Sequence, residues 1–194
     1  GQTIGRPILG TPETVQGFTS KQLHAFINRH YSADRMVVSA AGGVLHGELV
    51  AEVNKRLGGF RARSDGKLPA AAHYVGGDYR EHRDLMDAQF LIGFEGRAYH
   101  VRDFYASQLL SMILGGGMSS RLFQEVREKR GLCYSVYAFH WGFSDTGIFG
   151  VHAATGQDDL EKLVPLILSE LRRVSEDLTE AEVDRVRAQY RASL

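Results

Sequence analysis

Two side chains that could act together stand where a predicted basic helix turns into a predicted strand. Arg127 falls in the last turn of a helix that Ser119 can cap, and Gly131 supplies the left-handed residue that ends it. From Leu132 the apolar period changes to two, and Tyr134 is the third residue of this strand. The corner can therefore aim a guanidinium and a phenol toward one place. This pair is the best candidate for chemistry in the sequence.

Each residue of the pair also has a purely structural explanation. An arginine at a helix C-terminus interacts favourably with the helix dipole, and Glu125 and Glu128 stand close to Arg127. Tyr134 could be an ordinary strand aromatic with its hydroxyl at the rim of the core. The residue pattern alone leaves these alternatives open. The apolar face of the corner helix is predicted to consist of Leu122, Phe123 and Val126.

A glycine-rich segment precedes the corner helix. Leu114 to Ser120 reads L-G-G-G-M-S-S, and such a backbone before a helix can present free N–H groups to an anion. The segment lacks the Lys-Ser/Thr of a phosphate loop and follows a helix, which favours a tight junction between helices over nucleotide binding. Gly115, Gly116 and Gly117 could still let a peptide pass close to the backbone, which predicts a substrate-binding role for them.

The eight histidines do not form a zinc motif, because no two of them lie three or four residues apart. His140 and His152 could face each other across a predicted hairpin, with Cys133 nearby. Isolated histidines on strands are more often structural. We therefore predict no metal site within this chain.

Composition restricts the class of protein and of partner. With 194 residues, 43% of them hydrophobic, the chain can bury one ordinary core or two small ones. Its 23 basic and 23 acidic residues leave no net field that would favour nucleic acid or an anionic membrane, and no apolar run approaches the roughly 18 residues of a membrane helix. The single Cys133 excludes an intrachain disulfide, which suits a reducing compartment and favours the cytoplasm over the periplasm.

The elements around the corner follow an α+β order. Strands and helices come in pairs rather than alternating singly, which favours an antiparallel or mixed sheet with helices on one face. The run over 88–95 is apolar enough to be a central strand, and Pro165 should kink its helix or delay its start. Thr179 and Glu182 form a capping box for the last helix. The predicted strands span 77–87, 88–95 and 148–154, with another from 132, and the remaining helices span 102–114 and 158–174.

The first part of the chain is predicted as a loop over 1–17, a helix from Thr19 to near Ser32, a strand over 35–41 and a helix over 49–57 that ends at Gly58. Thr19 and Gln22 make a capping box. This part is too small to hold a core alone. The first helix is expected to bury a stripe formed by Leu23, Phe26, Ile27 and Tyr31.

A polar stretch over 61–72 is the predicted domain boundary. We predict a first segment over 1–66, a linker over 67–77 and an α+β domain over 78–194. The chain starts without an initiator Met, and its last helix is still periodic at Leu194. We therefore expect it to be a piece of a longer protein.

Four stretches carry a resemblance to one known family. They read G-R-P-I-L-G-T at 5–11, R-M-V-V-S-A-A-G-G-V at 35–44, L-G-G-G-M-S-S-R-L-F-Q-E-V-R-E-K-R-G-L-C-Y-S at 114–135 and D-T-G-I-F at 145–149. At these residues the sequence resembles the insulinase-like zinc peptidases, specifically the branch of mitochondrial processing peptidase and its bacterial relatives. The third stretch is the most specific, and together the four span nearly the whole chain.

The resemblance implies a repeated-domain metallopeptidase architecture. Zinc is held in the first domain of such proteins by an inverted His-x-x-Glu-His helix and a later Glu. The resemblance further implies that residues 1–66 are the trailing half of that domain, and that 78–194 belong to the next one, which closes over the substrate. The family places an Arg and a Tyr beside the zinc, and its spacing falls on Arg127 and Tyr134.

The same resemblance implies roles for this pair. Tyr134 would donate its phenolic proton to the oxyanion of the attacked peptide carbonyl, and Arg127 would hold a substrate carbonyl or orient Tyr134. The chain would then be an inactive fragment of a zinc metalloendopeptidase that cleaves peptides or presequence-like segments, with zinc only in the full-length protein. The alternative is a non-catalytic partner or structural core subunit of the family, in a homo- or heterodimer. A plain scaffold domain is the third alternative.

Overall fold

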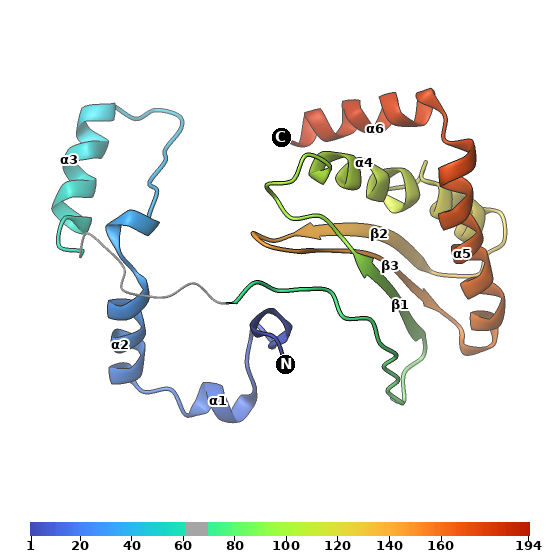
Figure 1. Ribbon diagram of the computed structural model, residues 1–194, viewed down its shortest axis with the longest axis horizontal. Coiled ribbons are helices and arrows are strands. Elements are labelled where there is room, and N and C mark those ends of the chain that lie inside the picture. The colour runs from blue at the N-terminus through green and yellow to red at the C-terminus, as the bar shows by residue number, and fades with distance from the viewer. Residues whose placement is uncertain (61–69) are drawn as a thin grey trace. The chain divides into compact units, whose positions relative to one another are not determined.

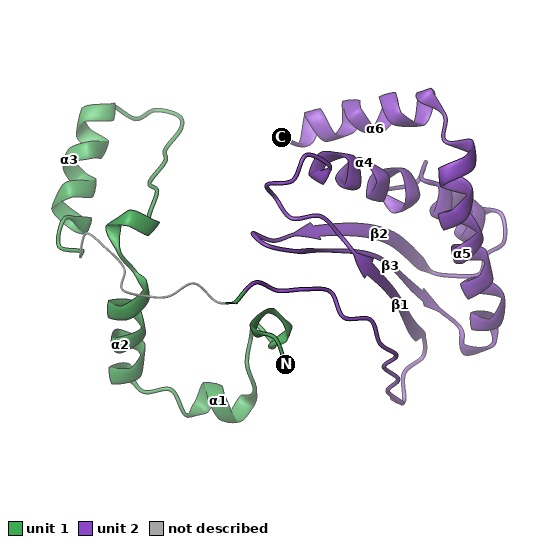
Figure 2. Ribbon diagram, in the orientation of Figure 1, with its two compact units in different colours: residues 1–70 green, residues 71–194 purple. Residues whose placement is uncertain are grey.

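A computed structural model describes residues 1–60 and 70–194 of the chain (Figure 1). These divide into two compact units, residues 1–70 and 71–194 (Figure 2). Most of the polar stretch predicted as the boundary, and the start of the predicted linker over 67–77, lie outside the described residues. None of the described helices is both long and apolar enough to cross a lipid bilayer.

Helices are the regular elements in the described part of the first unit. The predicted loop over 1–17 contains a short helix, because Thr11 and Thr14 form a capping box in front of it. The predicted capping box of α2 is confirmed, with the Thr19 N–H donating to the Gln22 carboxamide at 2.8 Å. α3 ends at Gly58, as predicted. The elements are α1 (Pro12–Gln16), α2 (Ser20–His30), α3 (His46–Leu57) and 3-10 turns at Thr3–Gly5 and Ala33–Arg35.

Two predictions about the first unit are wrong. The strand expected over 35–41 is absent, although Met36 is extended with φ −120° and ψ 135°. A strand needs a neighbour for its backbone N–H and C=O groups, and the described residues of this unit provide none. The apolar stripe of α2 (Leu23, Phe26, Ile27 and Tyr31) is between 42% and 57% exposed, because no sheet covers it there.

The second unit contains a three-stranded antiparallel sheet with the order β1-β3-β2. Its strands are β1 (Ala88–Glu95), β2 (Ser135–Gly142) and β3 (Gly147–Thr155), and the predicted hairpin of the last two is confirmed. β3 lies in the middle, so the prediction of a central position for β1 is wrong within the described sheet.

The strand predicted over 77–87 is also absent. These residues form no strand and pair with none, and their large side chains are exposed, by 84% at Tyr79 and by 100% at Met86. Charged side chains two residues apart pair with each other instead, as Arg80 does with Asp78 at 2.8 Å. The segment therefore lacks an apolar face that a sheet could bury.

Helices cover one face of the sheet, as Figure 1 shows, and this confirms the predicted α+β class. The helices are α4 (Phe104–Gly115), α5 (Leu160–Asp177) and α6 (Glu180–Ser193), and a π-helix over Phe123–Glu128 lies between α4 and β2. α5 begins at Leu160 and runs through Pro165, so Pro165 does not delay its start. The predicted capping box of α6 is confirmed. The core between sheet and helices consists of Ile113, Leu114, Leu122, Val126, Val136, Phe149, Val151, Ala153, Leu163 and Ile167.

Candidate functional site

The corner between α4 and β2 is a helix as predicted, but most of it is wound as a π-helix. Lys129 N–H donates to the carbonyl of Gln124, five residues back, at 3.0 Å. Ser119 does not cap this helix. The buried Ser120 takes the position before it: its hydroxyl donates to the Gly117 carbonyl at 2.6 Å. Isolated π-turns are rare and occur frequently at functional sites.

The two ends of the corner are fixed by burial and by a glycine. Leu122 and Val126 are completely buried, which confirms two of the three predicted core residues. Gly131 has φ +62° as predicted, and the following N–H, of Leu132, donates to the Val126 carbonyl at 3.0 Å. Tyr134 directly precedes β2 rather than being its third residue, and its N–H donates to the Ala154 carbonyl at 3.0 Å.

The structure brings the two predicted site residues together. The guanidinium carbon Cζ of Arg127 lies 5.8 Å from the centroid of the Tyr134 ring and 4.6 Å from that of Phe123. The Tyr134 side chain is 79% exposed, so the pair is accessible to a ligand. Phe123 was predicted to lie on the apolar face of the corner helix together with Leu122 and Val126. Its spacing of four residues from Arg127 is the signal that could have identified this contact.

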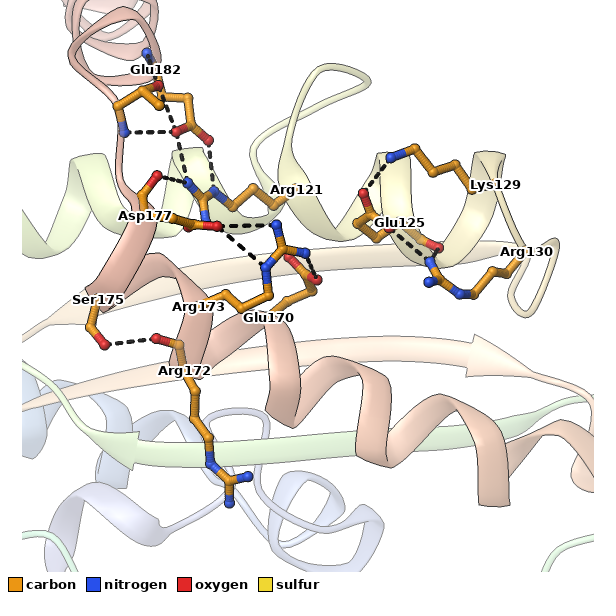
Figure 3. Close-up of polar contacts among 11 residues, drawn as sticks. Arg121, Glu125, Lys129, Arg130, Glu170, Arg172, Arg173, Ser175, Asp177 and Glu182 are labelled. Atoms are coloured by element: carbon orange, nitrogen blue, oxygen red, sulfur yellow. Dashed lines mark hydrogen bonds and ion pairs between the residues drawn. The ribbon is translucent and has the colours of Figure 1, made fainter.

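The guanidinium of Arg127 is not paired with a carboxylate within the described part of the chain. Glu125, one candidate for such a pair, instead accepts hydrogen bonds from Lys129 and from Arg130, the latter at 2.8 Å (Figure 3). The Lys129 and Arg130 bonds lower the pKa of Glu125. Arg127 is therefore held by two aromatic rings, and its N–H groups are available to an external acceptor.

The three glycines occupy different environments. Gly115 is buried, and a Cβ added there would lie 2.1 Å from the backbone nitrogen of Ala138, so this glycine lets α4 approach β2 closely. Gly116 follows the end of α4, and Gly117 has φ +135°; both are exposed. Their role toward a substrate remains a prediction.

We expect Gly115→Ala to lower the free energy of unfolding by about 3 kcal/mol, the upper end for an overpacked core, because the clash is with rigid backbone. Urea denaturation of the 194-residue chain measures this change. Gly93→Ala in β1 is the control, since a Cβ there meets nothing within 4 Å, and should stay within about 1 kcal/mol of wild type. Equal stability of the two variants would contradict the proposed close approach.

The two strand histidines do not face each other. His140 is buried on the helix side of β2, where its Nε2 accepts a hydrogen bond from the Arg97 N–H at 2.8 Å. His152 lies on the other face of the sheet, stacked on Tyr137 with 4.9 Å between ring centroids. Among the described residues, no three His, Cys, Asp or Glu side chains are close enough to hold a metal ion. Burial raises the pKa of the Cys133 thiol, which favours its protonated form.

His140 gives the fold a pH dependence with a definite sign. Burial lowers its pKa, so the folded state favours the neutral ring and the unfolded chain binds more protons as the pH falls below about 6.5. As the pH is lowered from about 7.5 to about 5.5, we expect the urea concentration at the unfolding midpoint to decrease, and to decrease less in His140→Gln. His152→Gln should keep the wild-type slope. If the urea midpoint of His140→Gln depended on pH as strongly as that of the wild type, the pH dependence would belong to other groups.

The sequence model of one protein family covers most of this chain. It describes the Peptidase M16 inactive domain and matches residues 17–190. A protein of Rickettsia bellii named an uncharacterized zinc protease is 38% identical over 194 residues, which are 100% of this chain and 47% of that protein. The chain thus spans about half the length of this relative.

Two solved structures share the fold. The peptidase M16 inactive domain from Pseudomonas fluorescens has a TM-score of 0.76 at 24% identity, covering 95% of this chain and 46% of that one. A chain of Complex III2 from Candida albicans has a TM-score of 0.82 at 24% identity, covering 98% of this chain and 48% of that one. At such identities the likeness concerns the fold alone.

Proposed function

The chain belongs to the M16 peptidase family, and from this premise we propose that it serves a zinc endopeptidase by donating hydrogen bonds from Arg127 and Tyr134 to a peptide substrate. The observation that carries the proposal is that the Arg127 guanidinium, which forms no ion pair with any residue that the structure describes, lies beside the exposed phenol of Tyr134. Both groups can donate hydrogen bonds, the guanidinium through its N–H groups and the phenol through its O–H. They suit a peptide carbonyl whose oxygen gains negative charge during hydrolysis.

The roles of the two residues differ. Tyr134 points its ring into solvent and would donate its O–H to the developing oxyanion, for which one donor typically contributes on the order of 10²- to 10³-fold in turnover. Arg127 is more enclosed, and its planar fork can hold a carbonyl oxygen of the substrate while its position beside Tyr134 orients the phenol. The substrates proposed on this basis are peptides or presequence-like segments.

Zinc is not held by the described residues of this chain, which contain no suitable cluster, and the sequence contains no His-x-x-Glu-His. The metal of a zinc protease, which activates the attacking water, would belong to another part of the intact protein. We therefore propose that the isolated chain is inactive, and that its own residues contribute hydrogen bonding alone. The cytoplasm remains the proposed compartment, favoured over the periplasm by the single free Cys133.

A second function, that of a non-catalytic partner or structural core subunit, is supported by the fold it shares with a chain of Complex III2. Such a subunit would form a homo- or heterodimer with another family member. In that role Arg127 and Tyr134 would either serve the partner's zinc or have no part in catalysis.

Peptide cleavage by the intact protein tests these functions. A quenched fluorescent peptide is incubated with the intact protein, with the 194-residue chain and with the intact protein after treatment with a zinc chelator. The peptidase function requires that the intact protein cleaves the peptide and the 194-residue chain does not. The chelator should abolish this cleavage, and added zinc should restore it. Absence of cleavage at every zinc concentration, with activity appearing only on addition of a second family member, supports the partner function.

A further inference from the structure

We propose that Arg121 and Glu182 are positioning residues for Arg127. Their ion pair fixes the start of the corner helix against α6, and thereby holds the guanidinium of Arg127 between the rings of Phe123 and Tyr134. This inference rests on the proposed function of Arg127 at the substrate. The ion pair of Arg121 and Glu182 takes no direct part in the proposed chemistry.

The guanidinium of Arg121 makes a two-pronged contact with the carboxylate of Glu182. Its Nε donates to Oε1 at 2.7 Å and its Nη2 to Oε2 at 2.8 Å (Figure 3). Nη2 also donates to the backbone carbonyl of Asp177 at 3.0 Å, and Nη1 to the Asp177 carboxylate. The side chains of Arg121 and Glu182 are only 11% and 17% exposed. Parallel paired hydrogen bonds of this kind fix orientation as well as distance.

The pair stays charged over the whole physiological range. The hydrogen bonds from Arg121 lower the pKa of Glu182 to about 2, and the Glu182 carboxylate in turn raises the pKa of Arg121. Glu182 has a second role, because it also accepts from the Thr179 N–H at 3.0 Å in the capping box of α6. One carboxylate thus joins the first turn of α6 to the first residue of the corner helix.

The last turns of α5 support the same group. Asp177, at the end of α5, accepts hydrogen bonds from Arg173 as well as from Arg121. Arg173 also pairs at 2.7 Å with Glu170, which is 2% exposed. The Arg121 side chain therefore ties the start of the corner helix to two helices, α5 and α6.

The other end of the corner helix is held by the buried Val126 and the turn at Gly131, and among the described residues no ion pair ties it to another helix. Within the described part of the chain, Arg127 forms no ion pair, and the backbone of the corner helix and two rings set its direction. In a continuous helical segment, a slip of one residue turns every later side chain by about 100°. A change at Arg121 can therefore redirect Arg127 without touching it. This is what distinguishes a positioning residue from a source of stability alone.

Two substitutions test the inference. Arg121→Lys keeps the charge and removes the fork, and Glu182→Gln removes the charge but retains a side chain that can complete the capping box. Asp184→Asn is the matched control, because Asp184 lies in the same first turns of α6 and its one ion pair among the described residues is with the exposed Arg187, at 3.3 Å. Urea denaturation of each variant shows whether it folds, and Glu182→Gln is the milder change if Arg121→Lys does not.

The direct readout is the NMR signal of the Arg127 side chain in the 194-residue chain, assigned by its disappearance in Arg127→Lys. Its guanidinium carbon lies over the Phe123 ring, 4.6 Å from the ring centroid, so we expect the nearby δ-protons to be shifted upfield by the ring current. We expect this shift to fall by half or more in both test variants and to persist in Asp184→Asn. A retained shift in both test variants overturns the positioning role, whatever their activity.

The second readout is peptide cleavage by the intact protein. A displaced Arg127 should lower kcat by roughly tenfold or more, since small misplacements of a site group have effects of that size. A lost NMR shift with unchanged kcat would uphold the positioning and overturn the proposed function of Arg127. A lowered kcat with an unchanged NMR shift would overturn the positioning alone. The two proposals can thus fail separately.

Discussion

Replacing Tyr134 with phenylalanine in the intact protein is expected to lower kcat for peptide cleavage by about 10²- to 10³-fold, the usual cost of losing one donor to an oxyanion. The substitution keeps the ring, and with it the contact in which the ring centroid lies 5.8 Å from the Arg127 guanidinium carbon. It removes only the phenolic O–H. Because the oxyanion exists in the transition state and not in the bound substrate, KM should change far less than kcat.

The control for this variant lies three residues further along the chain. Tyr137 is also accessible, 45% exposed, but its ring stacks on His152 on the face of the sheet that the helices leave uncovered. Tyr137→Phe should leave kcat within about twofold of wild type. Both substitutions should change the free energy of unfolding by no more than about 0.5 kcal/mol, since both residues are exposed. Equal kcat for Tyr134→Phe and wild type would remove the phenol from the mechanism.

Local signals in the sequence predicted several elements in each of the two units. The capping boxes at Thr19 and Thr179, the left-handed Gly131 and the exact span of β1 all depend on residues within a few positions of one another. The juxtaposition of Arg127 and Tyr134 follows from the same kind of information, because a helix, a glycine and a strand succeed each other within a few residues. The role of the pair stays a prediction.

Features that depend on distant partners were predicted wrongly or missed. The apolar run over 35–41 has strand composition, yet pairing needs a neighbour that the described residues of its unit do not supply. β1 is apolar enough for a central strand, but β3 takes that position through the hairpin with β2. The partners of Arg121 lie far along the chain, at Asp177 and Glu182, and no spacing rule connects them.

The π-helical winding belongs to a third category. Its defining hydrogen bond, from Lys129 to Gln124, differs from that of an α-helix by a single residue. The apolar spacing of Leu122 and Val126 fits an α-helix equally well. Both ends of the helix are tied to other elements, Arg121 by its ion pair to Glu182 of α6 and Gly131 by its turn into β2. The winding could not be read from the periodicity of the helix itself.

Arg127→Lys in the intact protein is expected to lower kcat/KM for peptide cleavage by about 10²-fold, close to the effect of Tyr134→Phe. Lysine keeps the positive charge, so a purely electrostatic role would survive the change. Lysine lacks the planar fork and cannot stack over Phe123 as the arginine does, whose guanidinium carbon lies 4.6 Å from the ring centroid. If Arg127 holds a carbonyl oxygen in one orientation, its replacement by lysine should therefore lower the activity.

Arg130→Lys is the matched control, because Arg130 lies in the same turn and pairs with Glu125 at the surface. It should change kcat/KM by no more than about twofold. Wild-type activity of Arg127→Lys would reduce the role of Arg127 to that of a charge.

The double variant Arg127→Lys/Tyr134→Phe decides whether the two residues act as one unit. If both hold or orient groups around the same carbonyl oxygen, the first loss already removes most of what the second could remove, and the combined effect should be much smaller than the product of the two single effects. The contact between the guanidinium and the Tyr134 ring gives a structural reason for such coupling. Effects that multiply fully would show instead that Arg127 and Tyr134 bind different parts of the substrate, and the shared oxyanion site would have to be abandoned.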